Sequence, residues 1–356
     1  MKNVLVTGGS GFIGSNFIHF LLNREQEIQI FNLDVLTYSG STENLRDIEI
    51  DPRYHFIKGN ICDTALDSQL LSENSIDTIV HFAAESHVDR SILGPGIFVE
   101  TNIMGTYTLL EAARNYWLRS ENPKNETYRF HHISTDEVFG TLTPDESAWT
   151  EDSAYAPSSP YSASKASSDH LVRSYGHTYG LPFTITNCSN NYGPYQFPEK
   201  LIPLIILNAL EKKPLPVYGD GQQIRDWLHV QDHCEAIYSV LKKGSPGSNY
   251  NIGGGNQPTN LSIVEKICDL VDEIKPDSIS RRELILYVKD RPGHDRRYAM
   301  DSGKISRELN WKPFYSLESG LRETVEWYIS HPEWVTAIRK QAEYQNWIDK
   351  NYENRK

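Results

Sequence analysis

Tyr161 and Lys165 stand four residues apart in the segment Tyr-Ser-Ala-Ser-Lys, at the start of a helix predicted over 162–179. Residues i and i+4 lie on one face of a helix. A lysine ammonium beside a phenol favours the tyrosinate and lowers the phenol pKa, which makes tyrosine a usable base near neutral pH. Because the chain contains 20 tyrosines, this spacing also arises by chance, and it gains weight only from its context.

Two adjacent carboxyl groups, Asp136 and Glu137, follow Thr135 directly after a strand predicted over 129–134. Ligands of open α/β sheets bind at the carboxyl ends of the strands. A pair of carboxyl groups beside a reaction centre supplies one acid and one base when their surroundings separate the two pKa values. The alternative is an ordinary loop with solvated acids, and the spacing alone does not exclude it.

A glycine-rich segment over 7–14 follows the first apolar run, and both G-x-x-G-x-x-G and G-x-G-x-x-G can be read in it. Glycines such as Gly8, Gly11 and Gly14 allow a tight turn and close approach to a pyrophosphate, which the next helix binds with its free N–H groups. Asp34, twenty residues after Gly14, is placed to bind a ribose 2′-hydroxyl and to repel a 2′-phosphate. The segment predicts dinucleotide binding, with NAD favoured over NADP. The alternative is a glycine-rich turn without a ligand.

The first half of the chain alternates short apolar runs with longer amphipathic runs. This alternation predicts a parallel sheet covered on both faces, a Rossmann-type doubly wound fold. Strands are predicted over 3–7, 28–33, 55–57, 78–82, 129–134 and 183–186, and helices over 15–22, 99–117 and 162–179.

After residue 188, prolines punctuate short segments, and helices are predicted over 261–274 and 316–330. This pattern predicts a smaller, irregular C-terminal α/β substrate lobe. We assign 1–188 to the NAD-binding domain, with a return around 227–255, and we assign 189–226 and 256–356 to the lobe. The tail after 332 carries Trp334 and Trp347 and is expected to be helical and docked, since exposing two indoles is costly.

The net charge of −12 argues against a general nucleic-acid or anionic-membrane binder. The sequence contains no run of 18 apolar residues, so we expect no membrane span. The cysteines Cys62, Cys188, Cys234 and Cys268 are widely spaced, which favours the reducing cytoplasm over a disulfide framework. The pair of histidines over 229–233 lacks the glutamate of a zincin motif, so no metal site is expected.

Taken together, these residues resemble the extended short-chain dehydrogenase/reductase superfamily and, within it, the dTDP-glucose 4,6-dehydratase family. Epimerases of the superfamily share the glycine loop and the Tyr–Lys pair, but they usually lack the Asp-Glu pair after the threonine. Asp136 and Glu137 are therefore the most specific part of the resemblance. The segments that carry it are 7–14, 81–90, 134–140, 161–165, 187–195, 197–203, 225–230 and 290–295.

The resemblance implies a three-step dehydration of dTDP-glucose to dTDP-4-keto-6-deoxyglucose. Tyr161, aided by Lys165 and Thr135, takes the 4-hydroxyl proton while the C4 hydride passes to NAD. Glu137 removes the acidified C5 proton, and Asp136 protonates the departing 6-hydroxyl. The hydride then returns to C6. A poor leaving group needs an acid and an activated carbon acid needs a base, so this division of labour is chemically consistent.

The resemblance also implies which residues line NAD. They are Gly8, Gly11, Phe12, Ile13, Gly14, Asp34, Val35, Leu36, Thr37, Asn60, Ile61, Phe82, Ala83, Ala84, Ser86, Thr101, Tyr161, Lys165 and Asn191. Asn60 stands where relatives usually have aspartate near the adenine, but asparagine still accepts a hydrogen bond.

A second implied set surrounds the nucleotide-sugar. It comprises Ser86, Thr135, Asn190, Lys200, Leu201, Pro216, Val217, Tyr218, Arg225, Asn260, Asp290, Arg291 and His294. Arg225 and Lys200 suit a diphosphate, which needs charge-assisted donors in an otherwise acidic protein.

The family usually forms homodimers through a helix bundle, for which 99–117 and 162–179 are the candidate helices. Ile103, Tyr107, Leu110 and Ala113 recur at the spacing of a packed face, although the same periodicity fits packing against the sheet. Two other functions stay open. One is a nucleotide-sugar 4-epimerase or decarboxylase of the same superfamily, and the other is a non-catalytic NAD-binding protein, which has no need of a tyrosinate.

Overall fold

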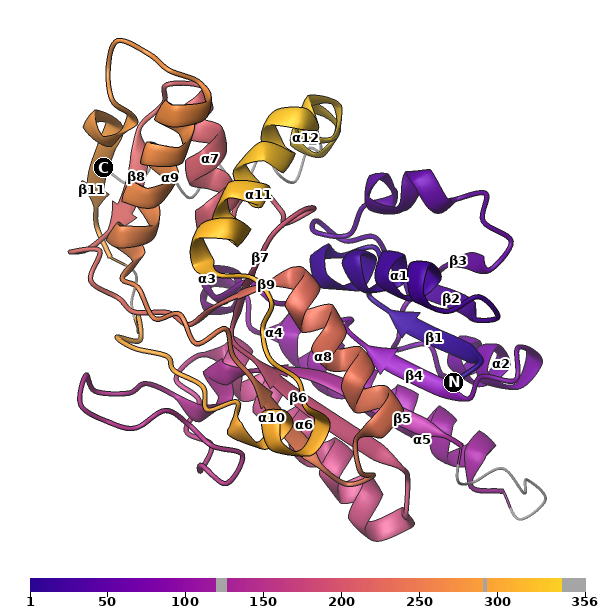
Figure 1. Ribbon diagram of the computed structural model, residues 1–356. Helices are drawn as coiled ribbons and strands as arrows, with labels where there is room; N and C mark the ends of the chain where they lie inside the picture. Colours follow the sequence, from indigo (N-terminus) through magenta and orange to yellow (C-terminus); the bar gives the residue numbers. More distant parts are fainter. Residues whose placement is uncertain (120–126, 291–292, 341–356) are drawn as a thin grey trace.

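A central parallel sheet organises the protein, whose computed structural model describes residues 1–119, 127–290 and 293–340. Within these ranges the sheet has seven strands in the order β10-β6-β5-β4-β1-β2-β3 (Figure 1). Each neighbouring pair runs parallel. The strands are β1 (Asn3–Thr7), β2 (Gln29–Asp34), β3 (Tyr54–Lys58), β4 (Thr78–His81), β5 (Arg129–Thr135), β6 (Phe183–Cys188) and β10 (Asn249–Ile252).

The structure confirms the six predicted strands, with ends that shift by at most two residues. Alternate side chains of β1 enter different cores, because successive residues of a strand face opposite ways. Leu5 packs beneath α2 (Thr64–Glu73), α5 (Thr106–Trp117) and α6 (Pro160–Tyr179). Val4 and Val6 pack beneath α1 (Phe12–Arg24) and α8 (Val230–Lys243) on the other face. The sheet is therefore doubly wound, as predicted.

Helix α6, which carries the Tyr–Lys pair, has strong local start and stop signals. Ser159 and Ser162 form a reciprocal capping box, and Pro160 occupies the first turn, where a missing N–H costs nothing. Gly180 ends the helix with φ +73°, a left-handed conformation that glycine adopts without strain. These residues fix where Tyr161 lies relative to the sheet.

The segment predicted as one helix over 99–117 consists of α4 (Gly96–Phe98), the π-helix η2 (Val99–Gly105) and α5. The predicted packed face does not hold together as one surface. Leu110 and Ala113 are fully buried against the sheet, whereas Tyr107 is 41% exposed. Two of the four residues predicted to form the dimer face, Leu110 and Ala113, therefore pack against the sheet instead, as the alternative interpretation expected.

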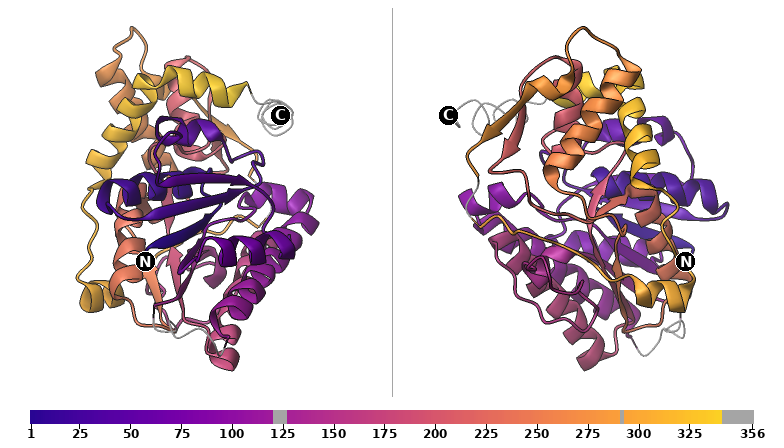
Figure 2. Two further views of the ribbon diagram at one scale, coloured as in Figure 1. Left: turned by 90° about the vertical axis from the view of Figure 1, so that its right-hand side faces the viewer. Right: turned by 60° about the vertical axis from the view of Figure 1, so that its left-hand side comes forward.

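The second lobe packs three helices and a small sheet around its own core, and it lies at the top of both views in Figure 2. Its helices are α7 (Leu201–Leu210), α9 (Asn260–Ile274) and α11 (Leu317–Ser330), and β8 (Leu215–Tyr218) pairs with β11 (Ile285–Val288). A further pair joins β7 (Asn190–Tyr192) to β9 (Trp227–His229). The remaining short elements are η1 (Thr42–Ile48), α3 (Val88–Leu93), η3 (Asp136–Phe139), η4 (Arg281–Leu284), α10 (Gly303–Leu309) and α12 (Pro332–Arg339).

The chain returns to the first domain within 227–255, the range predicted from the sequence. Helix α8 begins directly after His229 and covers the sheet, and β10 extends the sheet beyond β6. Helix α10, which the predicted division puts in the lobe, contributes Ile305 and Leu309 to a core with β10 and α8. The exact domain boundaries stay a prediction.

The C-terminal tail docks as far as the structure describes it. Trp334 of α12 is buried, and its indole N–H donates to Asn44 Oδ1 at 2.8 Å, which ties the tail to the first domain. Trp347 lies outside the described residues. Among the helices of the described ranges, none is long and apolar enough to span a membrane.

Asp67 of α2 is fully buried, and neither of its carboxylate oxygens has a hydrogen-bond partner among the residues that the structure describes. Burial, and next the charge of Asp63, raises the pKa of Asp67 from 3.8 to about 8. Folding therefore favours the protonated acid, so stability is lost as the pH rises from about 4 towards 8.

We expect Asp67→Asn to be more stable than the unchanged protein, with a gap in melting temperature that widens from pH 5 to pH 8. Each kcal/mol corresponds to about 1–2 °C in a chain of this size, because the entropy of unfolding grows with chain length. Thermal unfolding at several pH values measures the gap, and Glu73→Gln, an exposed change on the same helix, is the control. Melting curves that stay parallel across this pH range would contradict the expectation.

Candidate functional site

A cavity of about 540 Å³ opens at the carboxyl ends of the parallel strands. Its wall includes the residues that follow β1, β2, β4 and β5, as expected for a doubly wound sheet with its topological switch between β1 and β4. The glycine loop, the Asp-Glu pair and the Tyr–Lys pair all line this one cavity. The fold thus brings together groups that lie up to 157 residues apart, from Gly8 to Lys165.

The glycine loop is packed so closely that side chains would not fit. Gly8 has φ +70°, and a Cβ there would come within 2.6 Å of the Ala83 backbone. A Cβ on Gly14 would lie 2.4 Å from the carbonyl oxygen of Gly8. Helix α1 begins after Gly11 without a side-chain cap, so its first N–H groups and positive dipole end remain at the cavity wall. This loop can hold a pyrophosphate.

Asp34 ends β2 at the rim of the cavity, and backbone groups fix its carboxylate. It accepts from Ser10 N at 2.9 Å and from Leu36 N at 2.8 Å. Burial raises its pKa, and these two bonds oppose the increase. Leu36 alone among the predicted NAD-lining residues is absent from the cavity wall, although its N–H orients Asp34.

Tyr161 and Lys165 are both buried at the floor of the cavity. Lys165 Nζ donates to the carbonyl of Ile133 on β5 at 2.7 Å, and burial lowers the Lys165 pKa to about 8. Burial and then the charge of Glu137 raise the pKa of Tyr161 well above 10, while a hydrogen bond with Thr135 lowers it. The predicted lowering of the Tyr161 pKa is therefore wrong for the protein by itself, since burial and the charge of Glu137 raise it.

The two adjacent acids at the end of β5 have different surroundings. Asp136 is 2% exposed, and its Oδ2 has no hydrogen-bond partner in the described structure. Burial and then the charge of Glu137 raise the pKa of Asp136 well above 3.8, which favours its protonated form. Glu137 is only partly buried, and its N–H donates to Thr135 Oγ1 at 3.3 Å. The pair is not a solvated loop, because it lines the cavity beside Tyr161.

The predicted substrate residues fall into two groups. Ser86, Thr135, Asn190 and Lys200 line the same cavity as the predicted NAD residues. The others lie in the second lobe or near its edge, outside that cavity wall. They are Leu201 at the start of α7, Pro216, Val217 and Tyr218 on β8, Asn260 at the start of α9, and Arg225, Asp290 and His294. Arg291 lies outside the described residues.

Several residues of the second group contact one another. Asp290 Oδ1 lies 2.7 Å from His294 Nδ1, and the His294 ring meets Tyr218 edge-on with centroids 6.3 Å apart. Gln223 joins them, since its side-chain Nε2 donates to Asp290 Oδ2 and its backbone carbonyl accepts from Asn260 N. The lobe therefore gathers a polar, aromatic cluster from segments that are far apart in the sequence.

Arg225 lies between the two groups. It is buried, it donates to the carbonyls of Ile224 and Asp295, and its guanidinium lies 4.2 Å from the centroid of the Tyr298 ring. Its charge also lowers the pKa of Asp136, which places it near the reaction centre. Arg225 is thus fixed at the border between the cavity and the lobe.

Sequence reasoning missed several cavity-lining residues. Some of them lie within or beside the segments that carry the family resemblance, so the predicted residues next to them could have indicated their position. Glu85, for example, lies between Ala84 and Ser86. Others, such as Cys188, end a strand at the functional edge of the sheet. The missed residues with functional side chains include Tyr38, Ser39, Glu85, Ser134, Cys188, Ser189, Gln196, Phe197 and Glu199.

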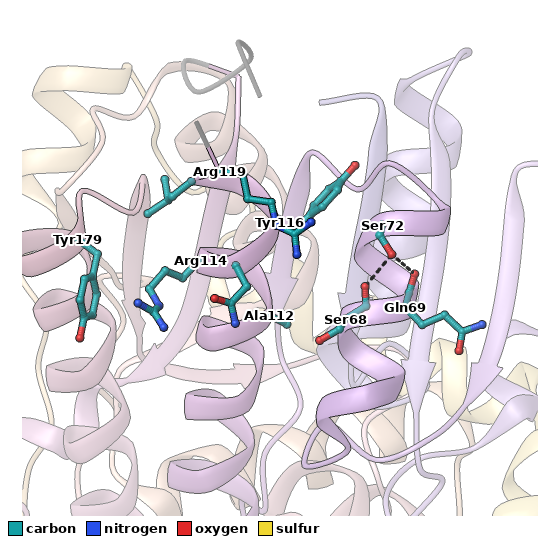
Figure 3. A pocket seen from close by; sticks show the side chains of 10 residues that line it. Ser68, Gln69, Ser72, Ala112, Arg114, Tyr116, Arg119 and Tyr179 are labelled. Carbon is teal, nitrogen blue, oxygen red and sulfur yellow. Dashed lines mark hydrogen bonds between the residues drawn. The ribbon is translucent and has the colours of Figure 1, made fainter. Parts of the chain in front are cut away.

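A second cavity of about 720 Å³ lies between α2, α5 and the end of α6 (Figure 3). Ser68 and Ser72 face it from α2, Arg114 from α5 and Tyr179 from α6. Its wall contains none of the predicted site residues, and Arg114 there already pairs with Glu111 at 2.8 Å. The residues that line this cavity include none of the groups that the chemistry above requires.

The chain matches the family model described as GDP-mannose 4,6 dehydratase over residues 5–324. It is 58% identical over 360 residues to the dTDP-glucose 4,6-dehydratase of Shigella flexneri, with 99% of both chains covered. The corresponding protein of Neisseria meningitidis serogroup B is 54% identical over 338 residues, covering 94% of this chain and 95% of the relative.

Solved structures give the same result. The dTDP-glucose 4,6-dehydratase of Bacillus anthracis in complex with NAD has a TM-score of 0.85 and 46% identity, covering 95% of this chain and all of the other. That of Streptomyces venezuelae with NAD and TYD bound has a TM-score of 0.86 and 45% identity at the same coverage. The fold and the site thus define a member of the family that the GDP-mannose 4,6 dehydratase model describes. Within it, the chain belongs to the dTDP-glucose 4,6-dehydratase family.

Proposed function

We propose that this protein is an NAD-dependent lyase that converts dTDP-glucose to dTDP-4-keto-6-deoxyglucose. The observation that carries the proposal is the placement of Asp136 and Glu137 beside Tyr161, in one cavity with the glycine loop. The close relatives named dTDP-glucose 4,6-dehydratase support the nucleotide and the sugar.

The residues present fit NAD. The glycine loop forms a cradle that a Cβ at Gly8 or Gly14 would fill, and the uncapped start of α1 suits a pyrophosphate. Asp34 offers a fixed carboxylate to a ribose 2′-hydroxyl and would repel the 2′-phosphate of NADP. When bound, NAD⁺ supplies the acceptor for the C4 hydride and a positive charge in the cavity, which favours tyrosinate.

The first chemical role belongs to Tyr161. Its phenolate oxygen takes the proton of the sugar 4-hydroxyl and becomes a phenol, and Thr135, within hydrogen-bonding reach, helps to hold the Tyr161 oxygen. Lys165 is anchored to β5 and is mostly protonated below its pKa of about 8, so its charge favours the tyrosinate. Oxidation to the 4-ketone then acidifies the C5 proton.

Elimination of water needs an acid and a base on neighbouring atoms. Asp136 is held protonated by burial and can give its proton to the departing 6-hydroxyl. Glu137, which is more exposed, takes the C5 proton. The two roles follow from the different surroundings of adjacent residues. A 4-epimerase needs no such pair, and the UDP-glucose 4-epimerase of Thermotoga maritima shares the fold at 28% identity and a TM-score of 0.81.

The nucleotide part of the substrate is assigned to the lobe. Arg225 and Lys200 supply positive charge for the diphosphate at the cavity border. The cluster of Tyr218, Asn260 and His294 offers a ring and polar groups for a nucleobase and ribose. No metal ligand enters the proposal.

Turnover of dTDP-glucose with catalytic amounts of NAD tests the proposal. We expect the 4-keto-6-deoxy sugar to form from dTDP-glucose and far more slowly from UDP-, CDP- or GDP-hexoses, as measured by mass spectrometry. If NAD binds but none of these sugars gives a keto product, the dehydratase assignment fails and a 4-epimerase or a non-catalytic role gains support.

Glu137→Gln should slow product formation by about 10²–10⁴-fold, because it removes the C5 base while keeping the side-chain shape. In heavy water the variant should also lose deuterium incorporation at C5 of the sugar. Glu146→Gln, a change in an exposed loop, is the control and should behave as the unchanged protein. Normal deuterium incorporation in Glu137→Gln would assign the base to another residue.

We also propose a homodimer, held together by the helices beside the sheet. Apolar side chains on α3, α4, η2 and α5 are exposed in the single chain, which is typical of an interaction surface. They are Ile92, Leu93, Ile97, Val99, Met104 and Tyr107. This surface replaces the predicted face, of which Leu110 and Ala113 are buried in the core.

Changing Met104 and Tyr107 together to glutamate should convert the dimer to a monomer, because two buried charges oppose association. Sedimentation velocity should then report one 40.7 kDa chain in place of two. Phe314→Glu is the control, since it alters an exposed apolar residue outside these helices. A monomeric unchanged protein, or a double variant that stays dimeric, would contradict the proposed interface.

We place the protein in the cytoplasm as part of the same proposal. All four cysteines are free thiols, and three of them are buried in the cores. A reducing compartment suits this state.

A further inference from the structure

Asp169 lies on the same face of α6 as the Tyr–Lys pair. It follows Tyr161 by eight residues and Lys165 by four, so the three side chains form one stripe along the helix. Its side chain is fully buried between α6 and the sheet. Neither the predicted site nor the cavity wall includes it.

The Asp169 carboxylate is tied to the strands that end at the cavity. Its Oδ2 accepts from Ser134 Oγ and from Tyr155 OH, each at 2.8 Å, and from Asn187 Nδ2 at 3.3 Å. Its Oδ1 lies 3.2 Å from His132 Nε2. Asn187 also donates to the carbonyl of Thr135 at 3.2 Å. One carboxylate thus connects α6 to β5 at the residue just before Thr135, and to β6.

These contacts keep Asp169 ionised in a buried place. Its pKa is lowered although burial opposes this, because the contact with His132, and then the charge of Lys165 and the hydrogen bond from Tyr155, outweigh desolvation. Burial lowers the His132 pKa to about 4, so this ring is neutral at pH 7. The charge of Asp169 therefore has Lys165 as its cationic counterpart, and Asp169 is the largest of the influences that raise the Lys165 pKa against burial.

We propose that Asp169 is a positioning residue, which keeps Lys165 protonated and holds the end of β5 in register with the Tyr161 face of α6. The inference rests on the proposed function and assigns Asp169 no contact with substrate or cofactor. It acts through Lys165 and through Ser134.

Other ionisable groups around Asp169 and Lys165 do not replace this charge. The His81 and His132 rings are neutral, because burial lowers both pKa values, and burial raises the Cys188 thiol pKa to about 12. The groups around the pair are His81 on β4, His132 on β5, Cys188 on β6, Tyr155 before α6 and Tyr161 on α6. Arg173 on α6 contacts Tyr155 rather than the pair.

The pH dependence of kcat/KM for dTDP-glucose tests the inference. In Asp169→Asn, Lys165 loses its proton at lower pH, so the alkaline limb should move down by about one pH unit or more. Asp169→Glu, which restores the charge, should return the limb towards its original position. Ser168→Ala is the control, because Ser168 is buried on the same helix and its hydroxyl bonds to the Lys165 carbonyl oxygen. Thermal melting of each variant reports folding independently of activity.

An Asp169→Asn protein that folds and shows an unmoved alkaline limb overturns the inference, whatever its total activity. If Asp169→Asn does not fold, Lys165→Arg replaces it, because a guanidinium keeps its charge throughout the measured range and the alkaline limb should then move up. An unmoved limb there also overturns the inference. If the unchanged protein forms no keto sugar, the proposed function and this inference both fail, whereas turnover with an unmoved limb removes only the inference.

Discussion

The parallel direction of the strands is the constraint on which the cavity depends. Because β1, β4 and β5 run the same way, their carboxyl ends meet at one edge and deliver the glycine loop, Ala83 and Thr135 to a common place. The tight contact between Gly8 and the Ala83 backbone is possible only with this alignment and with glycine at that position. A reversed β4 or β5 would carry its terminal residues to the far edge of the sheet.

Burial then decides which groups are charged. The same low-dielectric floor raises the pKa values of Asp136 and Tyr161 and lowers that of Lys165. Burial thus favours the protonated forms of Asp136 and Tyr161, and this effect comes from the fold rather than from the Tyr–Lys spacing.

Local signals made much of the fold predictable. Strand–turn–helix order around Gly8 and Gly14, and the apolar runs of the sheet, are read from neighbouring residues. Strand β10 was missed because Asn-Tyr-Asn-Ile is short and half polar, and only its pairing with β6 makes it a strand. The lowered tyrosine pKa was wrong because spacing carries no information on burial. Asp169 was missed because its importance comes from Ser134 and Tyr155, which contact it only in three dimensions.

Two adjacent acids acquire different surroundings through the short helix η3, which begins at Asp136. In a 3₁₀ turn, consecutive side chains point about 120° apart, so neighbours in sequence need not share surroundings. Thr135 caps this turn through Glu137 N, which fixes the rotation. Asp136 consequently points into the buried floor, whereas Glu137 is left at the more open wall. The acid and the base that we propose within one turn therefore depend on a tight helix at the end of β5, since a longer loop there would leave both carboxylates exposed to solvent.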